Sequence, residues 1–338
     1  MNVGYIKQKE MPFKIIDKMK YFASIVTVLQ FEEGTIFEVP IFDQEKKISK
    51  TIKNLLKQMN KYKIDTVVIS DQLLNKNPIM YQKVKEELYK CDRDILNGKK
   101  LMQYMSFDIL KYILDLQQTD MKQEDIFFLI KKEDTLDLQF LSKYVENCKT
   151  VNIVTNDLER FKKIQENLYE KEHILISVSN NKSKTLKRAK YILNMNMDQK
   201  DLTKYKINRE AIIINFKENV KYAPNTFSGI NINYFAIKIP DEHIETFEKI
   251  SPEEFDKAKL YETILLKKLE IEKKKNIMIS KSELAKRKNI VWDIINQDEI
   301  KITALIGNNG KIDEKEIIQK GKKNSKKEND KNLTKCEN

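Results

Sequence analysis

The sequence predicts an α/β protein built around a mainly parallel, doubly wound sheet. Between residues 125 and 239, short apolar runs alternate regularly with segments that have helical spacing. The runs are apolar without a polar alternation, which is typical of strands buried on both faces of a parallel sheet covered by helices. Right-handed crossovers between such strands give the doubly wound order.

The chain of 338 residues is long enough for two domains. Changes in composition along the chain indicate four parts. We expect a smaller N-terminal α/β domain at 1–122, the parallel sheet at 123–240, a mainly helical C-terminal segment at 241–318, and a disordered tail at 319–338. The tail is rich in Lys, Asn and Glu and has almost no apolar residues to bury.

The N-terminal part shows a β–β–α–β start followed by helices. The Glu33-Gly34 pair predicts a tight reversal between the first two strands, and a polar link at 118–124 marks the end of this part. The expected strands are 23–30, 35–41 and 65–70, and the expected helices are 46–62, 80–90 and 99–117.

The middle part repeats a strand–helix unit. The expected strands are 125–130, 151–155, 173–178, 191–193, 211–215 and 230–239, and the expected helices are 135–147, 157–169 and 184–190. Beyond Pro240 the pattern predicts a long helix at 253–275, a helical patch around Trp292, and a strand at 300–306 that turns back at Asn309-Gly310.

The charge of the chain says little about its partners. The net charge is +12, but only five of the 63 basic residues are Arg, the usual residue for bidentate phosphate and base contacts. A Lys-, Asn- and Ile-rich composition is typical of an AT-rich bacterial genome, so nucleic-acid binding is not favoured. Apolar runs of membrane-spanning or leader length are absent, and a cytoplasmic location is the expectation.

Residues suited to metal binding or proton transfer are scarce. Cys91, Cys148 and Cys336 lie far apart in the sequence, so they form neither a metal-binding spacing nor a disulfide framework. Of the two histidines, His173 is expected to open a strand, and His243 to lie in the solvated first turn of a helix. We therefore expect no metal site and little general acid–base chemistry by His.

Small polar side chains, mainly Asn, follow four consecutive strands of the middle part. Ligands of open α/β sheets bind at the carboxyl ends of the strands, so these side chains could line one crevice. The candidate binding residues are Thr155, Asn156, Asn180, Asn181, Lys182, Lys184, Asn194, Asn196 and Asn215.

The run from Val151 to Asn215 resembles the nucleotide-binding half of Rossmann-fold dehydrogenases, most closely the shikimate dehydrogenase type. The resemblance rests on Ser179–Lys184 after one strand and on Asn194 and Asn196 after the next. It implies a Rossmann-like sheet that binds NADP, with Lys182 and Lys184 meeting the 2′-phosphate. The chain departs from the family after strand 151–155, where the glycine-rich turn is absent and Asp157 is better interpreted as a helix N-cap.

Three functions therefore stay open. The first is binding of a nucleotide or NADP-type dinucleotide in the Asn-lined crevice, with oxidoreductase chemistry as the matching activity. The second is a non-catalytic Rossmann-like protein that acts through protein contacts. The third and weakest is nucleic-acid binding through the Lys-rich surface. The sequence does not decide whether the chain is an enzyme.

Overall fold

The computed structural model describes residues 1–131, 138–276 and 290–321, which form two compact units. Unit 1 consists of Met1–Leu101 and Lys238–Lys301, and unit 2 of Met102–Ile237 and Ile302–Asn338. The division expected from the sequence follows the chain in order. In the structure, the chain passes from unit 1 into unit 2, returns to unit 1, and ends in unit 2.

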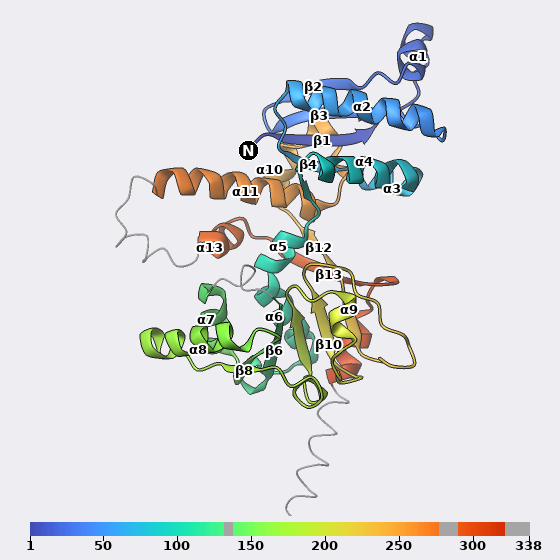
Figure 1. The fold of residues 1–338 in the computed structure, drawn as a ribbon. Coiled ribbons are helices and arrows are strands. Elements are labelled where there is room, and N and C mark those ends of the chain that lie inside the picture. Colours follow the sequence, from blue (N-terminus) through green and yellow to red (C-terminus); the bar gives the residue numbers. More distant parts are fainter. Residues whose placement is uncertain (132–137, 277–289, 322–338) are drawn as a thin grey trace, which may run out of the picture. The chain divides into compact units, whose positions relative to one another are not determined.

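Unit 1 contains the five-stranded sheet A, whose strand order is β2-β3-β1-β4-β5 (Figure 1). Strands β1 (Val3–Gln8), β3 (Gly34–Val39), β4 (Thr66–Ile69) and β5 (Asp94–Leu96) are parallel, and β2 (Thr27–Phe31) is antiparallel to β3. The hairpin between β2 and β3 confirms the reversal predicted at Glu33-Gly34.

The predicted β–β–α–β start omits β1, the strand that the structure places at the centre of sheet A. Its sequence, VGYIKQ, mixes a glycine and polar residues with the apolar ones, so it carries a weak strand signal. Gly4 is needed because a Cβ at this position would lie 2.9 Å from Ile64 Cγ2 and 3.0 Å from the Phe37 ring. The tight packing of the central strand is a tertiary requirement that the local sequence pattern does not reveal.

Helices cover both faces of sheet A. On one face, the helices are α1 (Ile15–Phe22), α2 (Glu45–Lys61), α3 (Asp71–Lys76) and α4 (Pro78–Lys90), which bury a cluster around Phe37, Leu55 and Val84. On the other face, Phe247, Ile250, Phe255 and Leu260 pack against Tyr5 and Val68. Phe247 directly precedes η4 (Glu248–Ile250), which contains Ile250. Phe255 follows η5 (Pro252–Glu254), and Leu260 lies in α11 (Lys257–Asn276). The returning C-terminal segment is therefore part of the core of unit 1.

Two further helices of the returning segment are α10 (Asp241–Glu245) and α13 (Ile290–Gln297). Trp292 lies in α13, as the sequence predicts. A partly buried ionic network centred on Asp298, the residue after α13, joins these helices to α11: Tyr261 Oη donates to Asp298 Oδ2 at 2.7 Å, and Lys268 Nζ donates to Asp298 Oδ1 at 2.6 Å. His243 Nε2 lies 3.4 Å from Asp298 Oδ1. The expectation of a solvated His243 is wrong, because this side chain packs into the network and is only 15% exposed.

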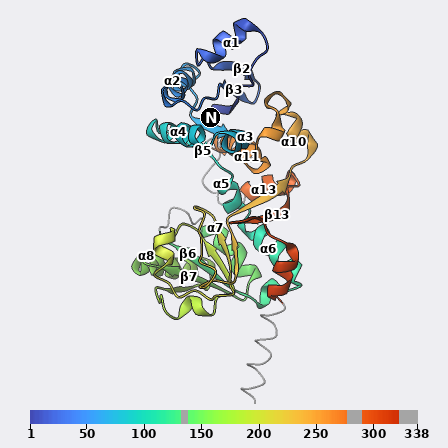
Figure 2. The same cartoon turned by 90° about the vertical axis from the view of Figure 1, so that its right-hand side faces the viewer.

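Unit 2 contains the six-stranded sheet B, with the order β11-β10-β9-β6-β7-β8 and parallel pairing throughout (Figures 1 and 2). Its strands are β6 (Asp125–Ile130), β7 (Thr150–Thr155), β8 (Ser177–Ser179), β9 (Tyr191–Asn194), β10 (Ile212–Asn215) and β11 (Ile230–Ile232). The predicted Rossmann-like α/β class is confirmed.

The two faces of sheet B are covered by different elements. Phe128 of β6 packs against Tyr144, which in turn contacts Phe107, so α6 (Ser106–Gln117) and α7 (Leu138–Asn147) share one face. Phe127 and Leu129 point the other way, toward a cluster containing residues of η3 (Thr185–Lys187) and α9 (Gln199–Leu202). The uninterrupted apolar sequence of β6 follows from this burial on both sides.

Several element boundaries differ from the predictions for local reasons. The helix predicted at 99–117 is divided at Met105 into α5 (Lys99–Tyr104) and α6. Helix α8 (Leu158–Glu172) extends further than predicted, and His173 adopts a left-handed conformation as its C-cap. His173 therefore ends a helix and does not open a strand, and β8 begins only at Ser177.

The strand predicted at 230–239 is divided at Asn233. Its first part is β11, and its second part, β12 (Tyr234–Lys238), joins the three-stranded sheet C with β13 (Lys301–Gly307) and β14 (Gly310–Lys311). The hairpin predicted at Asn309-Gly310 connects β13 and β14. A further helix covers residues 314–321, with Gly321 buried. The tail predicted to be disordered from residue 319 therefore begins within a helix, and its residues 322–338 lie outside the described residues.

In the described parts of the chain, every helix is too short or too polar to cross a membrane.

Candidate functional site

The strand order of sheet B defines one position where a ligand crevice is expected. From the central strand β6 the chain proceeds through β7 and β8 on one side, and then through β9, β10 and β11 on the other. The connections therefore reverse direction between β6 and β9. In doubly wound sheets, ligands bind outside the carboxyl ends of the strands at this switch point.

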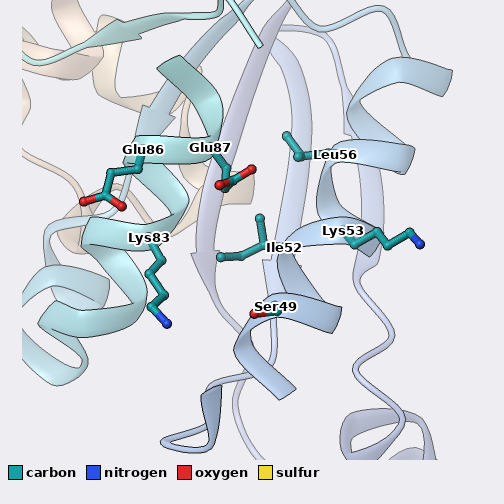
Figure 3. Close-up of a pocket in the computed structure, with 7 residues that line it drawn as sticks. All are labelled: Ser49, Ile52, Lys53, Leu56, Lys83, Glu86 and Glu87. Carbon is teal, nitrogen blue, oxygen red and sulfur yellow. The ribbon is translucent and has the colours of Figure 1, made fainter. Parts of the chain in front are cut away.

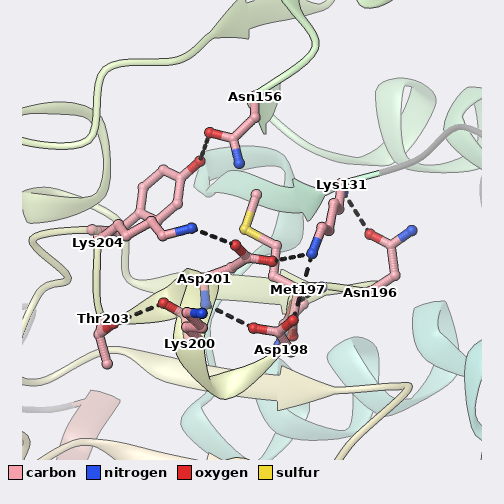
Figure 4. Close-up of polar contacts among 11 residues, drawn as sticks. Lys131, Asn156, Asn196, Met197, Asp198, Lys200, Asp201, Thr203 and Lys204 are labelled. Atoms are coloured by element: carbon pink, nitrogen blue, oxygen red, sulfur yellow. Dashed lines mark hydrogen bonds and ion pairs between the residues drawn. The ribbon is translucent and has the colours of Figure 1, made fainter.

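A charged cluster lies at the switch point. Lys131 follows β6, and its backbone N–H donates to Asn196 Oδ1 at 2.6 Å. The Lys131 ammonium lies 2.6 Å from Asp201 Oδ2 and 3.5 Å from Asp198 Oδ2. Lys204 Nζ donates to Asp201 Oδ1 at 2.8 Å. Figure 4 shows Lys131 and Lys204 approaching the Asp201 carboxylate from different sides.

The local sequence explains how α9 holds these groups. Asp198 is the N-cap of α9, and its side chain accepts from the Asp201 N–H at 2.7 Å. Asp201 is only 5% exposed. Hydrogen bonds from Lys131 and Lys204 hold the pKa of Asp201 below its usual range, and the pairing raises the pKa of Lys131. The cluster therefore stays charged near neutral pH, and two cations share one carboxylate.

Tyr205 connects this cluster to the tip of β7. Its hydroxyl donates to Asn156 Oδ1 at 3.1 Å, and this bond is the dashed line that ends at the labelled Asn156 in Figure 4. Lys182 Nζ lies 5.9 Å from the centre of the Tyr205 ring. Tyr205 also borders a cavity of about 450 Å³. The cavity is lined by Gln199, Leu202, Thr203, Tyr205, Ile207, Lys221, Tyr222, Ala223, Thr226 and Phe227. The rings of Tyr222 and Phe227 lie 4.6 Å apart in its wall.

Asn194 and Asn215 lie together, as their positions after adjacent strands predict, but both are buried in the protein. Asn194 Nδ2 donates to Asn215 Oδ1 at 2.9 Å and to the Met197 carbonyl at 3.0 Å. Asn215 Nδ2 faces the side-chain oxygens of Asn231 and Asn233 at 2.7 Å and 3.1 Å, and the Ile232 carbonyl at 3.2 Å. Asn194 is 2% exposed and Asn215 is fully buried, so these amides hold neighbouring loops to the strand ends.

The other predicted residues divide into two groups. Asn156, Lys182 and Asn196 lie at the cluster described above. The other four, Thr155, Asn180, Asn181 and Lys184, do not place their side chains in this cluster. The Thr155 hydroxyl is buried and accepts from the Asp157 N–H, and the Asn181 side chain accepts from the N–H groups of Ser183 and Lys184 within its own loop. Asn180 and Lys184 are exposed.

The strand order also corrects the assignment of the first strand. The resemblance places the phosphate-binding turn after strand 151–155, but the central strand from which both halves start is β6. The segment that corresponds to the phosphate-binding turn therefore starts after β6 at Lys131, and the residues that follow, 132–137, lie outside the described residues. Strand β7 becomes the second strand, and its tip carries Asn156 and Asp157, both exposed. In this fold, an acidic residue at the second strand contacts the ribose 2′-hydroxyl.

Sequence reasoning missed Lys131, Asp198, Asp201, Lys204 and Tyr205. The available signal was Asp198-Gln-Lys-Asp201 directly after the strand that ends in Asn194, a spacing typical of an N-capped helix start. In the part of the chain that the structure describes, no three His, Cys, Asp or Glu side chains are grouped as a metal site.

A second cavity of about 440 Å³ lies in unit 1 between α2 and α4. Ile52 and Leu56 of α2 point toward α4 across it (Figure 3). The charged residues on its rim are held by neighbours: Lys83 pairs with Glu45 at 2.6 Å, and Glu87 pairs with Lys90 at 2.5 Å. This cavity has no converging polar groups comparable to those at the switch point.

Comparison with known proteins gives little further information. No protein-family model and no curated protein matches the chain. Among solved structures, the chain is similar to L-tryptophan dehydrogenase from Nostoc punctiforme, with 10% sequence identity and a TM-score of 0.29 over 88% of this chain and 89% of that chain. The observed strand order supports the fold class independently of this distant likeness.

Proposed function

We propose that unit 2 binds a nucleotide at the switch point between β6 and β9, and that the ligand is a dinucleotide of the NADH type used for oxidoreductase chemistry. The observation that carries the proposal is the reversal of strand order with a cluster of charged and aromatic residues beside it. Fold alone does not define an activity, so these residues carry the functional assignment.

The tip of β7 supports the choice between NADH and NADPH. Asp157 is exposed there and could accept from the ribose hydroxyls of NADH, whereas its negative charge opposes a 2′-phosphate. Lys182 contacts Tyr205 and so lies near the same tip. Its positive charge favours the 2′-phosphate of NADPH. We expect Asp157 to dominate because the Lys182 side chain is exposed, so its ammonium is solvated and less effective than a carboxylate fixed at the strand end.

The expected affinity is weak. A glycine in the turn after the first strand lets the backbone approach the pyrophosphate, and residues 131–137 contain none. Lys131 could meet a phosphate only in competition with Asp198 and Asp201. A dissociation constant of roughly 0.1 to 1 mM is therefore expected for NADH.

Calorimetric titration of the full chain with NADH and NADPH tests the proposal. NADH should bind several-fold more tightly, and Asp157→Asn should remove the preference. Asn is a good N-cap, so this variant keeps the hydrogen bond to the Arg160 N–H. Glu159→Gln, an exposed acid in the first turn of the same helix, is the matched control and should leave the preference unchanged.

Tighter binding of NADPH, with the preference lost in Lys182→Ala, would restore the NADP-type ligand that the sequence resemblance implies. Absence of binding of either dinucleotide at millimolar concentration would refute the proposal. The second candidate, a non-catalytic protein that acts through protein contacts, would then be preferred. The observation that favours it is the glycine-free turn together with the two amides, Asn194 and Asn215, that are buried at the strand ends.

A further inference from the structure

Helix α1 in unit 1 has its apolar side directed away from the protein. Ile15, Ile16, Met19 and Phe22 follow the three- and four-residue spacing of one helix face, and they are 51% to 77% exposed. Tyr21 is the buried residue of this helix, and its hydroxyl donates to the Ile41 carbonyl at 3.2 Å. At about 100° per residue, Tyr21 lies on the side of the helix opposite the apolar face.

Further exposed apolar residues precede and follow α1 in the chain. We call this set the α1–β2 patch: Met11 (55% exposed), Phe13 (97%), Ile15, Ile16, Met19, Phe22 and Ile25 (46%). Leu29 of β2 is also exposed (47%), but it is paired with Ile36 and so lies on the other face of sheet A. With roughly 150 to 200 Å² for each large apolar side chain, the exposed fractions of the patch correspond to about 800 Å² of apolar surface. The largest patch of a typical monomer is about 300 to 600 Å². A stable protein interface buries about 800 Å² on each partner.

Strand β2, at the end of the patch, is also an open edge. It is the terminal strand of sheet A, so the outer side of its backbone has no strand partner among the described residues. Its sequence, Thr-Val-Leu-Gln-Phe, contains neither a charged residue nor a proline. Natural edge strands are usually protected by such residues, because an unprotected edge pairs with another strand. The edge and the apolar face thus occur in one stretch of chain.

We infer that the α1–β2 patch is an interface between two copies of this chain. Across a two-fold axis, β2 of one copy pairs antiparallel with β2 of the other, centred on Leu29, and joins the two sheets A into one. The apolar face of each α1 packs against the partner. Such an interface uses the same surface on both copies, and the uncharged strand places no like charges opposite each other.

The strand edge distinguishes this interface from a lipid surface. Anionic lipid could accommodate Phe13, Ile16 and Met19, with Lys18 and Lys20 at the polar boundary. However, the open N–H and C=O groups of β2 would find no partners in the hydrocarbon region. A second copy satisfies the backbone groups and covers the apolar face at the same time.

Sedimentation velocity of the full chain at micromolar concentrations tests the inference. The wild type should sediment as a species of twice the chain mass of 40.1 kDa. Leu29→Lys places two ammonium groups opposite each other at the centre of the paired strands, and Ile16→Lys/Met19→Lys introduces charge into the apolar face. Each variant should weaken dimerisation about tenfold or more. Ile79→Lys, at a residue of α4 that is 64% exposed, is the matched control and should dimerise normally.

Cross-linking tests the strand register and does not depend on loss of association. In a background with Cys91 and Cys336 replaced by Ser, Leu29→Cys should form an intermolecular disulfide under mild oxidation. The reason is that directly opposed residues in antiparallel strands have Cα atoms about 4.5 to 5.5 Å apart, which suits a disulfide. Ile79→Cys in the same background should remain monomeric on a non-reducing gel.

Three results would overturn the inference. The first is a wild-type monomer at tens of micromolar. The second is a dimer that neither Leu29→Lys nor Ile16→Lys/Met19→Lys weakens. The third is a monomer that co-sediments with phosphatidylserine vesicles and loses this property in Ile16→Lys/Met19→Lys, which would assign the patch to a lipid surface. Circular dichroism of each variant verifies that unit 1 remains folded.

Discussion

Replacing Asn215 by Asp exchanges a single NH₂ group for an oxygen at the centre of the buried amide network in sheet B. In the wild type, Asn215 Nδ2 faces three oxygen acceptors within 3.2 Å, and Oδ1 accepts from Asn194. In Asn215→Asp, an oxygen replaces the donor and faces these acceptors in a fully buried position. The substitution preserves the volume of the side chain, so packing is a minor part of the effect.

The expected loss of folding stability is large for the exchange of a single group. A buried charge without a cation and the loss of several hydrogen bonds typically cost about 3 to 5 kcal/mol. A loss of about 4 kcal/mol lowers the ratio of folded to unfolded unit 2 by about a thousandfold. The corresponding decrease in the melting temperature of this unit is roughly 10 °C. Urea or thermal unfolding of the full chain, followed by circular dichroism, measures the change.

The loss should also depend on pH. Burial among acceptors raises the pKa of the introduced carboxyl in the folded state above the value of about 3.9 in the unfolded state. The folded state therefore binds the proton more tightly, and the stability of the variant relative to the wild type increases as the pH falls through the folded-state pKa. The destabilisation should be complete at pH 7 and smaller near pH 4.

Asn180→Asp is the matched control, because Asn180 is exposed after β8, the edge strand of the same sheet. It should change the free energy of unfolding by less than about 0.5 kcal/mol. If Asn215→Asp is as mild as Asn180→Asp, the amide network is not what holds the strand ends together.

Three further predictions concern other buried groups. In unit 1, burial acts to raise the pKa of Asp298, but hydrogen bonds from Lys268 and Tyr261 outweigh it and hold this pKa below the usual value. Asp298→Asn should therefore cost about 1 to 3 kcal/mol in urea unfolding at pH 7, and the difference from wild type should disappear as the pH falls below about 4. Burial raises the pKa of Cys148 to about 12, whereas Cys91 is exposed. Mass spectrometry after iodoacetamide treatment of the native chain should find Cys91 alkylated and Cys148 unmodified, and alkylation of both at equal rates would contradict the buried position. The Tyr144 hydroxyl donates to Ser106 Oγ at 2.9 Å inside the core of unit 2. Tyr144→Phe should therefore lower the free energy of unfolding by about 1 kcal/mol, as measured by thermal unfolding. A change indistinguishable from zero would mean that this hydrogen bond makes no net contribution to stability.

The local pattern of the chain was sufficient to predict a parallel sheet in unit 2, although it started β8 four residues too early and joined β11 to β12. Phe127 and Leu129 face one side of β6 while Ile126 and Phe128 face the other, and burial on both sides requires the apolar run that the sequence displays. The same reasoning correctly predicts that Asn194 and Asn215 come together, because parallel strands end at the same edge. Strand β1 was missed because its position at the centre of sheet A depends on Gly4 fitting against Ile64 and Phe37, which are distant in sequence.

The candidate site required the tertiary structure. Alternating strands and helices determine that the sheet is doubly wound, but they do not specify which strand is central, because right-handed crossovers allow the chain to proceed to either side. Only the observed pairing of β6 with both β7 and β9 places Lys131 opposite Asp198 and Asp201, and makes Asp157 the residue at the tip of the second strand. The sequence by itself therefore determined the strands, their burial and the edge at which polar groups gather. The strand order, which depends on long-range pairing and packing, decided which of those groups meet and which are consumed in holding the fold together.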